Sequence, residues 1–198
     1  MAKVKAFALA LHCTLAALLA SSCGGGTSSA PQARMGNPCG GGICVSTVAG
    51  SGEFGNVDGS SRDAQLSLPH AVAVDANADV HVADYGNSNL TRLISGDVVS
   101  TPVAGAIDFP HPSDVATDSA GNKYVADRYG NRILKIAPGG ETSVLAGTGQ
   151  PGSEDGDAAS ASFSMPTGLA FDAQGALYIA DMGNRKIRKI TFPGGGAG

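Results

Sequence analysis

The sequence contains no tryptophan, and its aromatic and charged residues are sparse, at 5% and 15% of 198 positions. No long helical hydrophobic period follows residue 22. A serine nucleophile elbow, a phosphate-binding glycine loop and a His-x-x-x-His helix motif are all missing, which argues against the enzyme classes that these motifs define. Glycine is abundant instead, with 29 residues among short Val, Ile and Ala runs. This composition is typical of an all-β chain with short strands and tight turns.

Basic residues are also in deficit, with 13 Lys and Arg against 17 Asp and Glu, for a formal net charge of −4. Without Lys3 and Lys5 near the N-terminus, the balance is 11 against 17, or −6. This balance argues against a nucleic-acid partner. The run from Arg185 to Lys189 is basic, but its charges flank an apolar strand, and we expect them to form the solvated face of that strand.

Residues 1–22 have the features of a secretory signal peptide, because two lysines precede the apolar run Ala6 to Ala20. The segment Leu19 to Cys23 resembles the lipobox of bacterial lipoproteins, although Ala20 stands where that pattern prefers leucine. The resemblance implies export and lipidation of Cys23, with a membrane anchor on the periplasmic or cell-surface side. An ordinary cleaved signal is the alternative. A membrane span is disfavoured, since the run is shorter than the ~20 residues that a bilayer requires.

Residues 23–44 join the lipidated cysteine to the rest of the chain, and from Gly24 to Gly42 they are rich in Gly, Ser, Thr and Pro. Such a segment cannot bury enough apolar surface to fold, so we expect a flexible tether. Cys39 and Cys44 are candidates for a disulfide in an exported protein. The small loop would make it a local clip, and two cysteines alone do not complete a metal site.

Residues 45–192 contain one sequence pattern in three copies, which indicates a repeat architecture. Each copy starts at a proline, alternates small and large residues up to an aspartate, and continues into a strand that ends in Ala-Asp. The prolines are Pro69, Pro112 and Pro166. A face of small residues lets another sheet approach closely, as in radially packed sheets. We expect units at about 45–94, 98–136 and 142–190, followed by a Gly-rich tail at 193–198.

A Gly-Asn turn follows the second strand of every copy. The turn residues are Asp84, Asp127, Asp181, Asn87, Asn131 and Asn184. Glycine adopts positive φ, asparagine tolerates it, and an aspartate accepts backbone N–H bonds, so recurrence favours turn formation over a ring of metal ligands. In the first copy Ala78 replaces the glycine found at Gly121 and Gly175, and we expect Asn77 to take the positive φ there.

The motifs Pro-x-Gly-x-Ala-x-Asp, Leu-Tyr-Ile-Ala-Asp-x-Gly-Asn and Arg-x-Ile-x-x-Ile resemble those of NHL-repeat β-propeller proteins. Gly168 alone keeps the first of that family's glycines among the three copies. The resemblance implies an all-β fold of four-stranded blades around a central channel, with the Ala-Gly strand outermost. It also implies that Ser46 to Ala49 is free to complete the last blade.

Three four-stranded blades are fewer than the four to eight of closed propellers. The chain could form a partial propeller, close with unusual geometry, or pair with a second copy into six blades. We favour a partial or oligomer-completed propeller. Exposed edge strands would then promote self-association.

Two histidines flank the first-strand proline in adjacent copies, namely His70 and His111. Some proteins of this propeller group are lyases or lactonases with a metal in the channel, but here Met165 and Thr167 occupy the matching places in the third copy. We therefore predict no metal site and no cofactor, and keep the two histidines as candidates. The acidic run Glu154 to Asp157 could bind Ca²⁺, although a solvated loop is favoured.

The favoured function is binding or scaffolding at the cell envelope by a lipid-anchored propeller module. Its ligand would be a protein, a peptide or a polysaccharide, and the membrane would be contacted through the lipid alone. One alternative is a lactonase-like hydrolase or lyase with a channel metal. Another is a remnant of a longer propeller without independent function.

Overall fold

The computed structural model describes residues 42–87, 91–101 and 111–194. Residues 1–45 and 46–198 form two separate units, and the strands of the described residues all belong to the second. The predicted signal peptide, Cys23 and Cys39 lie outside the described residues, whereas Cys44 is described and is disulfide-bonded. Among the described residues, the helices are too short to cross a membrane.

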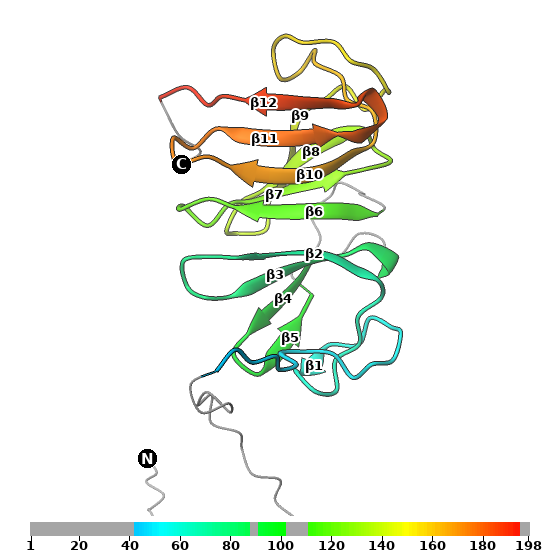
Figure 1. Ribbon diagram of the computed structural model, residues 1–198, viewed down its shortest axis with the longest axis vertical. Coiled ribbons are helices and arrows are strands. Elements are labelled where there is room, and N and C mark those ends of the chain that lie inside the picture. The colour runs from blue at the N-terminus through cyan, green and yellow to red at the C-terminus, as the bar shows by residue number, and fades with distance from the viewer. Residues whose placement is uncertain (1–41, 88–90, 102–110, 195–198) are drawn as a thin grey trace, which may run out of the picture. The chain divides into compact units, whose positions relative to one another are not determined.

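Three antiparallel sheets make up the second unit, and this confirms the all-β prediction (Figure 1). The first has the order β1-β5-β4-β3-β2, the second β6-β7-β8-β9 and the third β10-β11-β12. The strands are β1 (Gly59–Ser60), β2 (Pro69–Val74), β3 (Val80–Asp84), β4 (Thr91–Ser95), β5 (Val98–Ser100), β6 (Pro112–Thr117), β7 (Lys123–Asp127), β8 (Arg132–Ile136), β9 (Thr142–Ala146), β10 (Pro166–Phe171), β11 (Leu177–Asp181) and β12 (Lys186–Ile190). Two short 3-10 turns are η1 (Tyr85–Asn87) and η2 (Met182–Asn184).

The repeated sequence produces a repeated register. The opening proline pairs with the last aspartate of the next strand in every sheet, as in Pro69↔Asp84, and a bulge follows at once. Each bulge shifts the strand by one residue before regular pairing resumes. The innermost strands β2, β6 and β10 then lie next to one another, with β6 in contact with both of the others (Figure 1).

The strands group differently from the expected unit bounds. Strand β5 pairs with β4, and β9 pairs with β8, so each outer strand belongs to the sheet that precedes it in the chain. Tight connections explain this grouping: Gly96 and Gly140 adopt positive φ (57° and 95°) in the hairpins that precede the two outer strands. The sheets therefore span residues 59–100, 112–146 and 166–190, with five, four and three strands.

The segment Ser46 to Ala49 was expected to complete the last blade, and this expectation is not met. The segment is not a strand, and Ala49 packs against the core of the first sheet, formed by Ala64, Val82, Ile94 and Val99. Among the described residues, no fourth strand pairs with β12.

Two apolar cores hold the sheets together. The first core joins small residues of the first sheet, Ala71, Ala73 and Ala83, to larger ones of the second sheet. The second core places Tyr124 and Ile133 of the middle sheet among residues of the third. The sequence prediction that a face of small residues receives the next sheet is confirmed at the first core.

Candidate functional site

Four ring side chains form a continuous row where the first and second sheets meet. His70 is the second residue of β2, Tyr85 lies in η1, His111 directly precedes β6, and Tyr129 follows β7. Ring centroids are separated by 5.6 Å from His70 to Tyr85, 5.0 Å from Tyr85 to His111, and 5.1 Å from His111 to Tyr129. These spacings are those of favourable aromatic pairs. We call this set the aromatic–histidine row.

The repeat positions the row. The residue before each opening proline has positive φ, with 53° at Leu68, 71° at His111 and 49° at Met165. This conformation is uncommon for residues other than glycine, and its occurrence in all three sheets shows that the fold imposes it. Tyr85 directly follows the last aspartate of β3, so the neighbouring sheets place it beside His111.

Only some of the polar atoms of the row take part in hydrogen bonds. His70 Nδ1 donates to the Ser113 carbonyl at 2.6 Å, which fixes the proton on Nδ1 and leaves Nε2 as an acceptor. Tyr85 donates its hydroxyl proton to the Tyr129 hydroxyl at 3.3 Å. This hydrogen bond, with a smaller effect of burial, raises the pKa of Tyr85.

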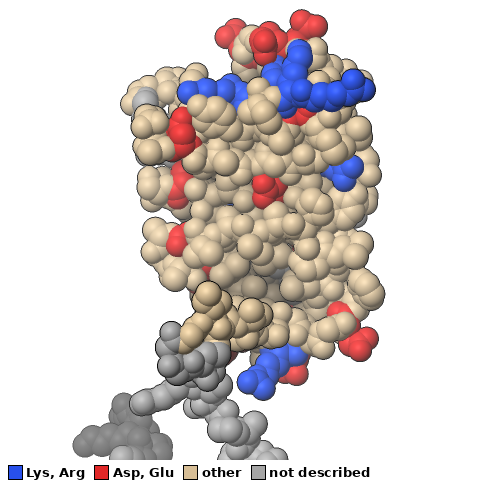
Figure 2. Space-filling view, viewed as in Figure 1, with Lys and Arg blue, Asp and Glu red and all other residues tan. Residues whose placement is uncertain are grey.

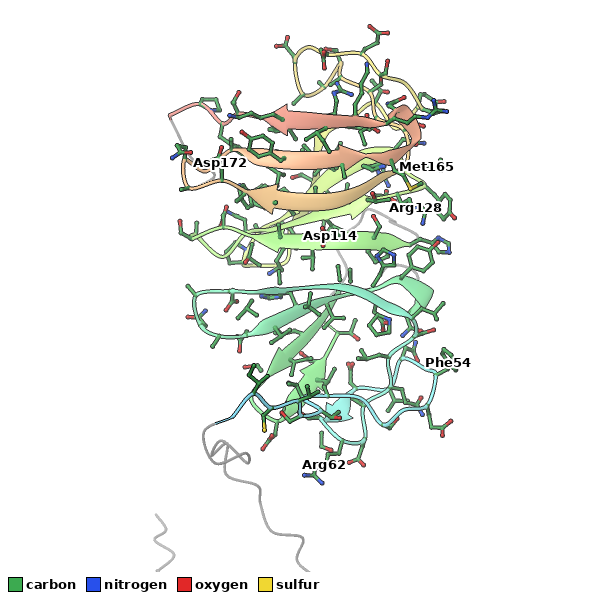
Figure 3. All side chains as sticks on the ribbon, viewed as in Figure 1. Phe54, Arg62, Asp114, Arg128, Met165 and Asp172 are labelled. Atoms are coloured by element: carbon green, nitrogen blue, oxygen red, sulfur yellow. The ribbon has the colours of Figure 1, made fainter. Side chains whose placement is uncertain are left out.

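Two nitrogens beside the row have no hydrogen-bond partner among the described residues, namely His111 Nδ1 and Arg128 Nε, although both atoms are buried. The Arg128 guanidinium lies 5.5 Å from the Tyr129 ring centre. Arg128 and Met165 lie at the same edge of the sheets, and Asp172 lies at the opposite edge (Figure 3). A buried donor or acceptor without a partner is costly, so these nitrogens are suited to a ligand or bound water.

The metal candidates His70 and His111 both pack against the Tyr85 ring. In the part of the chain that the structure describes, no group of three or more His, Cys, Asp or Glu could hold a metal ion.

The turn aspartates hold their hairpins through buried carboxylates. Asp84 Oδ1 accepts the Ser67 N–H at 2.7 Å, and its Oδ2 accepts Asn87 Nδ2 at 2.6 Å. Asp181 repeats this with Ser164 N and Asn184 Nδ2, both at 2.7 Å. Asp127 in the middle sheet instead accepts Gly130 N at 3.1 Å and Arg132 Nε at 2.8 Å.

The glycines of these turns serve a purpose other than positive φ. Gly86 N donates to the Ser67 carbonyl at 2.7 Å, and an added Cβ would lie 2.6 Å from that oxygen. Close approach therefore requires glycine there. Positive φ falls later in the turn, on Asn131 (51°) and Arg185 (55°).

The expectation for Asn77 was wrong, because Ala78 itself has φ 65°. Ala78 N donates to the Asp75 carbonyl at 3.0 Å, and Asp75 Oδ1 accepts Asn77 N at 2.9 Å. These bonds repeat those at Gly121 and Gly175, so the turn keeps its geometry despite the alanine.

The basic run is not wholly solvated, because Arg188 is buried. Its guanidinium donates to Asp155 Oδ1 at 2.7 Å, to Asp181 Oδ2 at 3.1 Å and to the Glu154 carbonyl at 2.8 Å. Figure 2 shows Lys and Arg side chains over β12 beside the acidic side chains of the neighbouring loop. The Arg188 guanidinium therefore links this acidic loop to the third sheet.

A second repeated contact links the aspartate at the end of each inner strand to the strand that follows. Asp75 Oδ2 accepts His81 Nε2 at 2.9 Å, and Asp118 Oδ2 accepts the Tyr124 hydroxyl at 2.9 Å. The His81 bond is the largest cause of the lowered pKa of Asp75. Burial, followed by the Asp118 bond, raises the pKa of Tyr124.

Sequence comparisons give distant relatives, and no family model matches the chain. Protein SUPPRESSOR OF QUENCHING 1, chloroplastic, of Arabidopsis thaliana is 36% identical over 109 residues, covering 54% of this chain and 10% of the plant protein. NHL repeat-containing protein 2 of Gallus gallus is 27% identical over 134 residues, covering 66% of this chain and 18% of the chicken protein. The chain thus spans a small part of these relatives.

Among solved structures, an auxiliary nutrient binding protein from Bacteroides ovatus aligns with a TM-score of 0.54 at 16% identity. The alignment covers 67% of this chain and 36% of that one. Together with the repeated three-sheet arrangement, these similarities define an NHL-repeat-like β-propeller fold.

Proposed function

We propose that this chain is an exported, lipid-anchored binding module of the cell envelope, and that the aromatic–histidine row contacts its ligand. The signal-like leader and the lipobox-like Cys23 support export and anchoring. The solved protein with a similar fold that is described as a nutrient binding protein is consistent with a binding role, although the likeness is one of fold.

The observation that carries the binding role is the row itself, in which four rings follow one another at centroid distances of 5.0 to 5.6 Å, with His70 and Tyr129 exposed. Tyr129 is 52% exposed, and Tyr85 and His111 are half-buried. Tyrosine in such a setting offers an apolar body with a hydrogen-bonding tip. A ligand that combines flat apolar faces with many hydroxyl groups fits this surface.

Neutral polysaccharide is therefore the proposed ligand class. Sugar rings have apolar faces that would stack on Tyr129, and their hydroxyls would pair with His70 Nε2 and with the Tyr129 hydroxyl. Arg128 is a cation beside the row, but a single ion pair contributes little binding energy. Charge alone would therefore not hold a strongly acidic ligand.

The test is titration of the purified full chain with neutral oligosaccharides, and in parallel with uncharged and acidic peptides. Tyr129→Ala should weaken oligosaccharide binding at least tenfold, or about 1.4 kcal/mol. Tyr129→Phe should have a smaller effect because it keeps the ring. The matched control is Val144→Ala, which changes an exposed apolar residue on β9, away from the row. Binding of peptides but not of sugars would contradict the ligand class.

The alternative of a metal-dependent hydrolase or lyase rests on His70 and His111. It predicts ester or lactone turnover that requires added zinc and disappears with His70→Ala. The binding proposal predicts that oligosaccharide affinity is the same with zinc and with a chelator.

A further inference from the structure

Each contact between consecutive sheets joins one face of the earlier sheet to one face of the later sheet. We call the face that meets the following sheet the trailing face, and the face that meets the preceding sheet the leading face. The trailing face of the first sheet includes Ala71 and Ala73, and it meets Val115 on the leading face of the second sheet. The trailing face of the second sheet includes Tyr124 and Ile133, and it meets the third sheet. The same kind of interface is thus used twice.

The leading face of the first sheet has no neighbouring sheet among the described residues. Val72 stands at the position of Val115, yet it is 63% exposed where Val115 is 3% exposed. Val74, two residues later on the same face of β2, is 59% exposed. Adjacent exposed valines on an innermost strand are unusual for a surface in water.

The trailing face of the third sheet is also exposed, and it is the face that would meet a leading face. Ile187 stands at the position of Ile133 and is 72% exposed, whereas Ile133 is fully buried. Tyr178 stands at the position of Tyr124, and the exposed fractions are 36% and 0%. One chain therefore exposes both halves of the interface that it uses twice internally.

The unpaired edge of β12 provides an independent observation. In the middle sheet, β9 pairs with β8 in the register Ile133↔Ala146. The sequence Ser46-Thr-Val-Ala-Gly50 matches Ser143-Val-Leu-Ala-Gly147 at the end of β9, but it forms no strand. Within the described ranges, β12 thus has an open edge, and the matching segment Ser46 to Gly50 pairs with no strand.

Gly50 has the backbone conformation of its counterpart Gly147, but among the described residues the hairpin that lies against Gly147 has no equivalent beside Gly50. Gly147 has φ 104°, and an added Cβ would lie 2.8 Å from the Asn131 carbonyl oxygen. Gly50 has φ 111°, but the nearest atom to an added Cβ is Leu66 Cδ1 at 3.9 Å. Space that a neighbouring hairpin fills beside Gly147 is open beside Gly50.

That space is an open groove of about 570 Å³ in the second unit. Its lining includes Ala49, Gly50, Glu53, Leu66 and Leu68. In the matching place between the second and third sheets, Met165 N donates to Asn131 Oδ1 at 3.0 Å, so a hairpin sits against the counterpart of Leu68. Arg185, directly before β12, and Lys186, its first residue, are exposed, and their charge is opposite to that of Glu53 in the groove.

We propose that a second copy of this chain covers both open faces, and that Ser46 to Ala49 of each copy extends the third sheet beside β12 of the other. Closed propellers typically contain four to eight blades, and two copies of three sheets fall within this range. The two contacts are related by twofold symmetry, and the ring closes. This proposal is independent of the ligand that the aromatic–histidine row binds.

The test is the mass of the full chain by sedimentation in mild detergent, with Cys23→Ala to remove any lipid. The expected result is a two-chain particle. Ile187→Glu on the trailing face and Val72→Glu on the leading face should each produce a single-chain particle, since each substitution affects both contacts of the ring. Val144→Glu, on the outer strand of the middle sheet, should leave the two-chain mass unchanged. Circular dichroism would confirm that all variants keep the strand content.

Other outcomes would overturn the proposal. A single-chain mass for the unsubstituted chain at tens of micromolar would do so. A two-chain particle lost with Ile187→Glu but kept with Val72→Glu would show a contact between two trailing faces instead. A series of increasing masses would show open chains of copies, which contradicts ring closure.

Discussion

The middle sheet and the two outer sheets have the same repeated sequence but differ in how they are covered. The middle sheet has a neighbour on both faces, and its core residues Val115, Tyr124 and Ile133 are buried. The first and third sheets each have a neighbour on one face, and the equivalent residues Val72 and Ile187 are mostly exposed. Burial in this fold is therefore set by the neighbouring sheet and not by the repeat unit itself.

This comparison explains why equivalent positions should respond differently to substitution. In a repeat protein, stability is approximately the sum of the stability of each unit and of its contacts with its neighbours. A residue on a covered face contributes to both terms, while its counterpart on an open face contributes to one. Of the four predictions below, the first and the last compare matched positions of the repeat, and the other two test ion pairs of the third and first sheets.

The largest difference is expected between Tyr124→Ala and Tyr178→Ala. Tyr124 is buried against Phe171, with ring centroids 5.1 Å apart, and donates to Asp118. Its removal should cost about 4 kcal/mol of unfolding free energy. Tyr178→Ala should cost under about 1 kcal/mol in the single-chain Ile187→Glu background. Urea unfolding measures both, and equal losses would contradict the comparison.

A smaller but still large effect is expected at Asp181, one of two carboxylates that Arg188 contacts. Asp181→Ala should cost about 3 kcal/mol, because the buried Arg188 and the Ser164 amide lose their partner. Asp155→Ala removes the exposed partner of the same arginine and should cost about 1 kcal/mol or less. A larger loss with Asp155→Ala in urea unfolding would show that the loop contact dominates.

The Asp75–His81 pair in the first sheet should make stability depend on pH. The pKa of Asp75 is lowered in the folded chain, chiefly by the His81 hydrogen bond, so the ionised carboxylate stabilises the fold. This stabilisation is fully present above the ordinary value of ~3.9 and is lost as pH falls through the lower folded pKa. Asp75→Asn should cost about 1.5 kcal/mol at pH 7, and less as pH falls from ~4.

The control for this pH effect is Asp157→Asn in the exposed acidic loop, which should change stability little at either pH. Thermal unfolding across the pH range compares the two variants. A constant difference between Asp75→Asn and the unsubstituted chain down to the lowest pH would argue against an ionised Asp75 in the folded state.

The smallest effect concerns the turn in which the first sheet has alanine and the others have glycine. Ala78→Gly should stabilise the chain by about 0.5 kcal/mol, because glycine removes the αL strain but adds unfolded-state entropy. The reverse change, Gly121→Ala, should destabilise by about 1 kcal/mol. An added Cβ there meets Pro138 Cγ at an ordinary 3.6 Å, so the cost is conformational. A stabilising Gly121→Ala would refute this explanation.

The local elements were predictable from the sequence because the determinants of a strand pair are close together in the chain. The proline-to-aspartate strands and the hairpins after Asp84, Asp127 and Asp181 form where the repeat indicates. The alternation of small and large residues also predicted the faces that pack, since a strand places successive side chains on opposite faces.

The candidate site was only half predictable. The sequence identified His70 and His111, but Tyr85 and Tyr129 join them because neighbouring sheets bring their edges together. Tyr85 directly follows the last aspartate of the second strand in its copy, and this position could have identified it as a candidate site residue. Arg188 was expected in solvent, but the acidic loop, 33 residues earlier in the chain, covers it. Contacts between residues this far apart in the chain cannot be predicted from local sequence patterns.

The most direct test of the account is a disulfide between two copies. Chains carrying Ala49→Cys would be mixed with chains carrying Ile187→Cys, and the linked peptides would be identified by mass spectrometry. Within one chain, the equivalent pair Ala146→Cys and Ile133→Cys is the positive control, because those residues are register partners. We predict that the Ala49 and Ile187 positions link across copies as readily as the control pair links within one. Linkage in the control without linkage across copies would contradict the completed ring.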